Sequence, residues 1–142
     1  MRFWDSSAVL PLLVEEPGTA AMVALLVEDP AAAVWWLTPV ECWSALGRLE
    51  REQRLTEDGV TAAARLLAEA ARRWTEVPPI DRVRDQAARL VRLHPLRAAD
   101  ALQLAAALVL SDFDPGTLPF VTLDDRLASA ARREGFEVLG TT

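Results

Sequence analysis

The stretch "RFWDSSAVL" (residues 2–10) joins a short apolar run to the start of an apolar helical pattern, with Asp5 at the junction. An acid at this position either caps the helix or lies at the end of a strand as a functional group. Aspartate is a preferred N-cap residue, so its position alone does not separate the two interpretations. The other strands and acids of the chain bear on this choice.

The composition is typical of a folded protein that does not span a membrane. The 142 residues suit one compact domain, and a hydrophobic content of 51% argues against disorder. No uncharged run exceeds 11 residues, whereas a transmembrane helix needs about 20. Asp5, Glu15 and Glu16 make the N-terminus unlike a signal peptide. We therefore expect a single domain over residues 1–142, located in the cytoplasm.

Residue types that are rare in the chain exclude several kinds of site. Cys42 and His94 are the only residues of their types, so neither an intrachain disulfide nor a Cys/His zinc site can form. All 15 basic residues are arginine, which excludes the P-loop because that motif requires lysine. The net charge of −6 disfavours non-specific nucleic-acid binding, although arginines can still form a local phosphate site.

Apolar runs alternate with helical periods along the chain. We expect strands near residues 2–5, 32–37, 75–77, 118–122 and 136–139. Helices are expected at 57–74 with Thr56 as N-cap, at 81–93, at 97–110, and at 125–134 before Gly135. This alternation predicts an α/β fold with a parallel sheet covered on both faces. Ligand sites in such folds gather outside the carboxyl ends of the strands.

Most of the 21 acidic residues need no special explanation, and those in "EREQ" (50–53) and "RREG" (132–135) fit solvated helix faces. Four acids differ because each lies beside apolar sequence at the start of a helix: Asp5, Glu41, Asp100 and Asp124, with Asp125 as an alternative to Asp124. A capping box formed by Thr38 and Glu41 would explain Glu41 structurally. Asp100 is harder to explain, because an unpaired carboxylate is costly in the apolar stretch "RAADALQLAAALVL" (97–110).

Several carboxylates at one end of a sheet raise each other's pKa and destabilise the fold unless a cation neutralises them. Magnesium and manganese prefer oxygen ligands, and a carboxylate-held ion can activate water and stabilise charge on a phosphoryl group. The residues alone therefore predict metal-assisted phosphodiester hydrolysis. Its ligands and catalytic groups would be Asp5, Glu41, Asp100 and one of the pair Asp124 and Asp125.

Four blocks of the chain resemble PIN-domain ribonucleases, and most of all bacterial VapC-type toxins. The blocks are "DSSAVLPLLVEEPGT" (5–19), "TPVECWSAL" (38–46), "HPLRAADALQLAAAL" (94–108) and "FVTLDDRLASAAR" (120–132). The resemblance implies a three-layer α/β/α fold around a parallel sheet of about five strands. It also implies cleavage of structured RNA, such as tRNA or rRNA, with Mg²⁺ or Mn²⁺ as cofactor.

The resemblance extends to site residues and partners. Asp5, Glu41 and Asp100 match the three main acids of the family, and Asp124 matches the fourth. The doubled Asp124–Asp125 departs from the pattern and makes the fourth position ambiguous by one residue. Ser6 and Thr122 match hydroxyl residues that help to hold the acids. The implied partners are a second copy of the chain and a cognate antitoxin whose tail covers the acidic site.

Two other classes of function stay open. Another metal-dependent phosphoesterase, such as a flap-type DNA nuclease or a phosphatase, would use the same acids. Phosphatases with an aspartyl nucleophile usually have a second Asp two residues after the first, where this chain has Ser7. The other class is a non-catalytic PIN-like domain that only binds RNA or protein, and the presence of all four acids counts against it.

Overall fold

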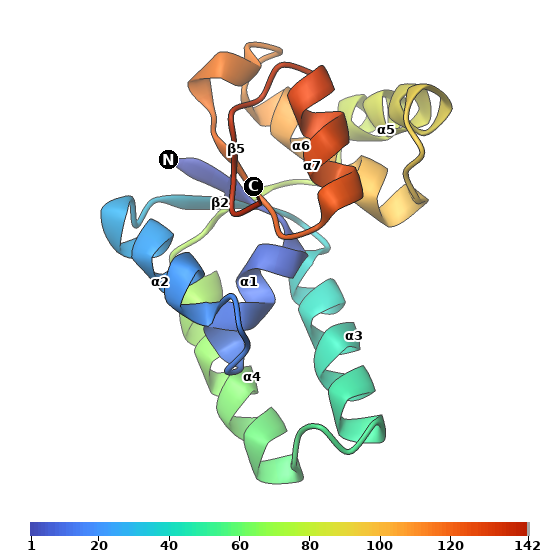
Figure 1. The fold of residues 1–142 in the computed structure, drawn as a ribbon. Coiled ribbons are helices and arrows are strands. Elements are labelled where there is room, and N and C mark those ends of the chain that lie inside the picture. The colour runs from blue at the N-terminus through green and yellow to red at the C-terminus, as the bar shows by residue number, and fades with distance from the viewer. Residues whose placement is uncertain (142) are drawn as a thin grey trace.

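A parallel sheet runs through the molecule, and helices cover both of its faces (Figure 1). The structure is a computed structural model and describes residues 1–141. Along the chain the elements are β1 (Arg2–Trp4), α1 (Ser6–Leu13), α2 (Thr19–Glu28), β2 (Ala32–Trp35), α3 (Thr38–Arg51), α4 (Glu57–Ala71), β3 (Thr75–Val77), α5 (Asp81–Leu93), α6 (Ala98–Leu110), a 3₁₀ turn (Pro115–Thr117), β4 (Phe120–Val121), α7 (Asp125–Arg133) and β5 (Val138–Leu139). The expected α/β/α fold is confirmed.

The described strands are arranged in the order β3-β2-β1-β4-β5, and every neighbouring pair is parallel. The chain moves outward from β1 to β2 and β3, and then returns to the other side of β1 with β4 and β5. In the register of the sheet, Phe3 lies beside Ala33 on one side and beside Phe120 on the other. The reversal between β1 and β4 is a topological switch point, where ligand sites form in open α/β sheets.

Alternating side chains of the strands feed two hydrophobic cores, one on each face of the sheet. Phe3 and Phe120 stack with ring centroids 5.3 Å apart and belong to the core under α5, α6 and α7. Trp4 and Val121 point to the opposite face and pack with α1, α2, α3 and α4. Figure 1 shows these two groups of helices on opposite sides of the sheet. Both faces of β1 and β4 are therefore buried up to the point where the strands end.

The expected helices are confirmed to within a few residues at their ends. Helix α5 has the predicted bounds, whereas α4 ends three residues earlier than expected, at Ala71. The predicted N-cap of α4 is confirmed, because Thr56 Oγ1 accepts a hydrogen bond from the Gly59 backbone N–H at 3.0 Å. All the expected strands are present, but those other than β3 are shorter than predicted. No helix within residues 1–141 is long and apolar enough to span a membrane.

Gly135 ends α7 in the predicted place. Its φ of +100° lies in the left-handed region that favours glycine. The backbone N–H of Phe136 donates to Ala131 O at 3.0 Å, and that of Gly135 donates to Arg132 O at 3.0 Å, which together form a Schellman motif. A Cβ on Gly135 would lie 3.0 Å from Pro115 Cγ, so space as well as backbone conformation favours glycine here.

The sequence predicts a solvated helix face at residues 132–135, and this prediction is wrong for Glu134. Its carboxylate accepts a hydrogen bond from Arg89 and lies 3.0 Å from His94 Nε2, which joins the end of α7 to the end of α5. Partial burial alone would raise the pKa of Glu134, but the bonds from Arg89 and His94 outweigh it and hold the pKa below its ordinary value. Glu134 is therefore a structural acid, away from the switch point.

Candidate active site

Asp5 directly follows β1, and its carboxylate lies at the switch point. Its backbone N–H donates to Val121 O at 3.0 Å, which ties the residue to β4. Its side chain is buried, and Oδ2 accepts hydrogen bonds from Ser7 Oγ at 2.5 Å and Thr122 Oγ1 at 2.7 Å. Asp5 occupies the N-cap position of α1, but its side chain makes no capping hydrogen bond to that helix. The structure thus favours the second interpretation of Asp5, an acid held at a strand end.

The environment of Asp5 favours its protonated form. Burial is the largest influence and raises the pKa of the Asp5 carboxyl. Hydrogen bonds from Ser7 and Thr122 lower it in part, and the nearby Glu41 carboxylate raises it again, so that the pKa of Asp5 stays above its ordinary value. An ionised Asp5 would be stabilised by a cation.

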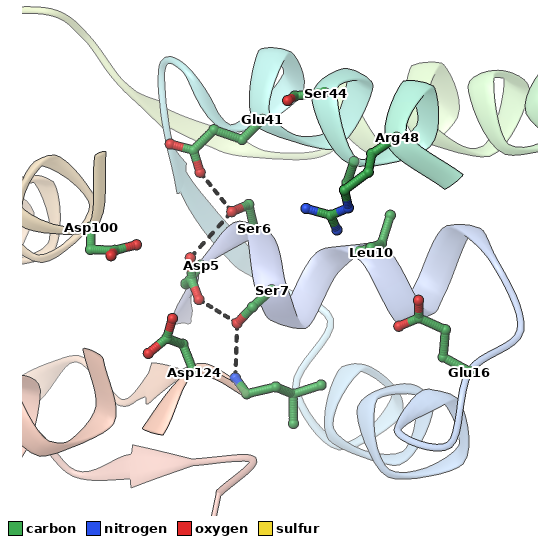
Figure 2. A pocket seen from close by; sticks show the side chains of 12 residues that line it. Asp5, Ser6, Ser7, Leu10, Glu16, Glu41, Ser44, Arg48, Asp100 and Asp124 are labelled. Atoms are coloured by element: carbon green, nitrogen blue, oxygen red, sulfur yellow. Dashed lines mark hydrogen bonds between the residues drawn. The ribbon is translucent and has the colours of Figure 1, made fainter. Parts of the chain in front are cut away.

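Glu41 lies in the first turn of α3 and faces Asp5. Its Oε2 accepts hydrogen bonds from Ser6 Oγ at 2.6 Å and from Gln103 Nε2 at 2.8 Å. Ser6 Oγ also lies 3.3 Å from Asp5 Oδ1, so one hydroxyl group is placed between the two carboxylates (Figure 2). The matches of Ser6 and Thr122 to hydroxyls that hold the acids agree with these contacts, whereas Ser7 was not anticipated as a donor to Asp5.

The capping box that would have explained Glu41 structurally does not form. Leu37 is the N-cap of α3, and Thr38 is already the first residue of the helix. Thr38 Oγ1 accepts a hydrogen bond from Gln103 Nε2 at 3.2 Å instead of one from its own helix. The buried amide of Gln103 needs acceptors, and Thr38 and Glu41 provide them, so a tertiary contact replaces the local one.

Gln103 is a supporting residue that the sequence analysis missed. It is fully buried in α6, and within residues 1–141 its Oε1 has no hydrogen-bond partner. It lies three residues after Asp100, so both side chains are on one face of the helix. A single amide in the apolar run "ALQLAAAL" (101–108) was the available signal.

Asp100 projects from the first turn of α6 toward the same region (Figure 2). Burial raises the pKa of Asp100, and the carboxylates of Asp124 and Asp5 raise it further. The charge of Arg97 acts in the opposite direction but leaves the pKa above its ordinary value. Arg97 forms no ion pair with Asp100, so the partner that this acid was expected to need is not supplied by the described part of the chain.

Asp124 follows β4 and has two roles in the structure. Its Oδ1 accepts a hydrogen bond from the Leu127 backbone N–H at 3.0 Å, which caps α7. It also lines the cavity that contains the other three acids, whereas Asp125 does not line it. The acid that caps α7 and the acid that lines the cavity are therefore one residue, Asp124.

The four acids line one open cavity of about 510 Å³. They come from the ends of β1 and β4 and from the first turns of α3 and α6, and in Figure 2 their carboxylates face a common space. The remaining lining residues are Ser6, Ser7, Leu10, Glu16, Ser44, Ala45, Arg48 and Leu123. The structure thus brings together all the acids singled out from the sequence except the alternative Asp125.

The donors in this cavity fit a hard divalent cation by their chemistry. Carboxylate oxygens are the ligands that Mg²⁺ and Mn²⁺ prefer, and two of the four acids have pKa values raised by burial and by their neighbours. As the side chains stand, however, no group of three or more His, Cys, Asp or Glu residues in the described chain is placed to hold a metal ion. Binding by Asp5, Glu41, Asp100 and Asp124 would require their side chains to move closer together.

Comparison with known proteins assigns the chain to a family. Residues 2–133 match the PIN domain. The chain belongs to the PIN-domain family. This confirms the resemblance noted in the sequence.

Two relatives of this PIN domain are Ribonuclease VapC45 from Mycobacterium tuberculosis (strain CDC 1551 / Oshkosh) and Ribonuclease VapC49 from Mycobacterium tuberculosis (strain ATCC 25618 / H37Rv). Each is 34% identical over 139 residues, which cover 96% of this chain and 92% of the relative. The crystal structure of PAE2754 from Pyrobaculum aerophilum is similar in fold, with a TM-score of 0.60 and 24% identity. That similarity covers 91% of this PIN domain and 78% of the other chain.

Proposed function

We propose that this PIN domain is an endoribonuclease and acts as the toxin of a toxin–antitoxin pair. The observation that carries the proposal is the gathering of Asp5, Glu41, Asp100 and Asp124 around one cavity at the carboxyl ends of β1 and β4. The names of the two mycobacterial relatives, both ribonucleases, support RNA as the substrate. The reaction would be hydrolysis of a phosphodiester bond in structured RNA such as tRNA or rRNA.

Different side chains of the site would have different roles in catalysis. Ser6, Ser7 and Thr122 hold Asp5 and Glu41 in place through their hydroxyl groups. A Mg²⁺ or Mn²⁺ ion held by the four carboxylates would supply the means to lower the pKa of water and to stabilise charge on the phosphoryl group. Asp100 forms no ion pair within residues 1–141, and burial together with the carboxylates of Asp124 and Asp5 raises its pKa, which makes its carboxylate a stronger base for accepting a proton from water.

The proposal includes the partners and the setting of such a toxin. A cognate antitoxin would cover the acidic cavity, and two copies of the chain would form a homodimer in the cytoplasm, each copy one nuclease domain over residues 1–142. Trp36, Val40 and Trp43 are 47%, 61% and 50% exposed around the start of α3 and offer apolar area for contact with another protein.

The test is cleavage of purified tRNA and rRNA, with single-stranded and double-stranded DNA as competing substrates. We expect RNA to be cut, a chelator to abolish cleavage, and Mg²⁺ or Mn²⁺ to restore it. Asp5→Asn keeps the shape of the side chain but removes the anionic charge, so the variant should fold and should neither cut RNA nor arrest growth of its host. Asp85→Asn is the matched control, because Asp85 is exposed on α5 and away from the cavity.

Several outcomes contradict the proposal. Full activity in chelator rules out the carboxylate–metal mechanism. Cleavage of DNA in preference to RNA would make the chain a DNA nuclease that uses the same acids. A folded Asp5→Asn variant, verified by circular dichroism, that still arrests growth at the expression level of the wild type would return Asp5 to a structural role.

A further inference from the structure

Four arginines line the surface beside the acidic cavity, although the chain as a whole is acidic, with a net charge of −6. Arg48 of α3 lines the acidic cavity itself. A second hollow of about 720 Å³ is lined by Arg48, Arg97 and Arg126, and a third of about 240 Å³ by Arg126 and Arg133. Asp100, Asp124 and Asp125 also line the second hollow, and Asp125 lines the third, so arginine and aspartate side chains alternate next to the site where the four acids meet.

The three hollows adjoin one another. The acidic cavity and the second hollow share Ser44, Arg48, Asp100 and Asp124 as lining residues. The second and third hollows share Pro95, Asp125 and Arg126. The acidic cavity therefore continues as a depression. This depression passes the N-terminal ends of α6 and α7 and then follows α7. In Figure 1 these helix ends lie near the first turns of α3.

The arginines reach this depression from three elements. Arg97 is the N-cap of α6, and Arg126 and Arg133 are on α7. The last two are seven residues apart, which is about two helical turns, so they project from the same face of the helix. All four arginine side chains are exposed to solvent.

Five of the fifteen arginines form ion pairs, and the other ten, including the four of the depression, form none within residues 1–141. Arg2, Arg54, Arg82, Arg84 and Arg89 each form an ion pair with an acidic side chain. Within residues 1–141, no ion pair involves the four arginines of the depression, even though Asp124 and Asp125 line the same hollows. Their guanidinium groups are available to an anion from outside the chain.

We propose that Arg48, Arg97, Arg126 and Arg133 form a phosphate-binding track that holds the RNA backbone and leads it to the acidic cavity. The inference rests on the proposed function, in which RNA is the substrate. Guanidinium groups bind phosphate oxygens in a bidentate manner, and the loss of condensed counterions makes such binding salt-dependent. No Phe or Trp side chain lines the hollows along α7, and His94, which lines the third, is buried and held by Glu134, so the track contacts backbone phosphates without reading the base sequence.

A phosphodiester fits both ends of this depression better than an acidic peptide does. At the arginine end, phosphates and carboxylates are both acceptable anions. At the acidic end, a divalent ion typically joins protein carboxylates to substrate phosphates, whereas peptide carboxylates would add further like charge. We therefore assign RNA as the ligand of the track.

The test measures binding of a fluorescein-labelled RNA hairpin with single-stranded tails by anisotropy, in chelator so that no cleavage occurs. Arg126→Gln and Arg133→Gln should each weaken binding about three- to tenfold and make the dependence on salt shallower by about 0.7–0.9 in log–log slope. In the double variant, binding should be weakened by the product of the two single-variant factors. Arg97 is left unchanged, because its charge also acts on Asp100. Arg65→Gln is the control, since Arg65 is exposed on α4 and lines none of these hollows.

The same variants are then compared in single-turnover cleavage with Mg²⁺, where the track predicts that the RNA concentration for half-maximal rate rises. Equal binding and cleavage by the double variant and by Arg65→Gln would overturn the track while leaving the nuclease proposal in place. RNA binding through Arg126 and Arg133 without cleavage by the wild type would support the track and overturn the nuclease proposal. Displacement of RNA by polyglutamate as readily as by unlabelled RNA would overturn the assignment to RNA in favour of an acidic protein partner.

Discussion

Replacing Asp100 by asparagine should raise the free energy of unfolding at neutral pH in the absence of metal, while abolishing cleavage. Within residues 1–141 Asp100 forms no ion pair, and burial together with the carboxylates of Asp124 and Asp5 raises its pKa. A carboxyl whose pKa is raised by folding binds its proton more tightly in the folded state. The ionised form therefore destabilises the fold, and Asp100→Asn removes the charge while keeping the shape.

Two opposing effects set the magnitude. Asp100 lies in the first turn of α6, and loss of its interaction with the helix dipole costs about 0.3–1 kcal/mol. Relief of the desolvation of the charged carboxylate, and of its repulsion from Asp124 and Asp5, acts in the other direction, on the order of 1–2 kcal/mol after a discount for solvent screening of a partly buried group. The expected net gain is about 0–1.7 kcal/mol, or up to about 5 °C in Tm for a chain of this size.

The gain should depend on pH with a definite sign. At pH values below the ordinary Asp pKa of 3.8, Asp100 is protonated in the folded and the unfolded state, so the variant has no advantage. As the pH rises, the unfolded state loses its proton first and the wild type is progressively destabilised. The advantage of Asp100→Asn is complete once the pH exceeds the raised pKa of the folded state.

The assay is thermal unfolding in chelator between pH 4 and pH 8, repeated with Mg²⁺. A ligand at 100 times its Kd stabilises the wild type by about 2.7 kcal/mol, and Asp100→Asn should lose most of this increment. Asp85→Asn serves as control, with an expected change within about 0.5 kcal/mol. A loss of several kcal/mol in chelator would refute the reasoning, because it would mean that Asp100 is paired in the native state. A gain that does not change with pH would refute it as well.

Three further predictions concern residues around the site and the end of α7. Gln103→Leu should weaken Mg²⁺ binding about 10–100-fold in calorimetric titration, because Glu41 loses an orienting donor, and unchanged affinity would contradict that role. Glu134→Gln should lower the free energy of unfolding in urea by about 1–2 kcal/mol at pH 7, and this difference should shrink as the pH falls below the ordinary Glu value of 4.5, since the stability from a lowered pKa is lost as the pH falls through the folded-state pKa. Burial, with a contribution from Glu41, raises the pKa of Cys42 to about 12, so this thiol should resist Ellman's reagent at pH 8 until the protein unfolds, and rapid labelling of the folded chain would disprove its burial.

Much of the fold was predictable because its signals are local. The strand positions follow from short apolar runs, and α5 from a hydrophobic stripe that repeats every three to four residues. Thr56 and Gly135 mark helix ends through their own backbone and side-chain chemistry. The predicted strand lengths were less accurate. A strand ends where its neighbour in the sheet stops pairing with it, and that neighbour is distant in the sequence.

The candidate site was predictable in its acids but not in its supporting contacts. Asp5, Glu41, Asp100 and Asp124 stood out because each follows or interrupts apolar sequence, and the structure places all four around one cavity, while their catalytic role stays a prediction. The donors Ser7 and Gln103 were missed, because their bonds span residues that are far apart in the chain. The N-cap role considered for Thr38 was wrong for the same reason, because it rested only on residues close to Thr38 in the sequence.

The sequence by itself determined the order of strands and helices, the family and the acids that could hold a cation, because hydrophobic periodicity and residue chemistry are properties of short segments. Only the tertiary structure decided that Asp124 rather than Asp125 faces the cavity, that Gln103 donates to Glu41, and that the Glu134 carboxylate belongs to a link between α5 and α7. Each of these outcomes depends on the packing of elements against the sheet. Packing sets burial and distance, and these decide which carboxylates meet each other and which meet a donor.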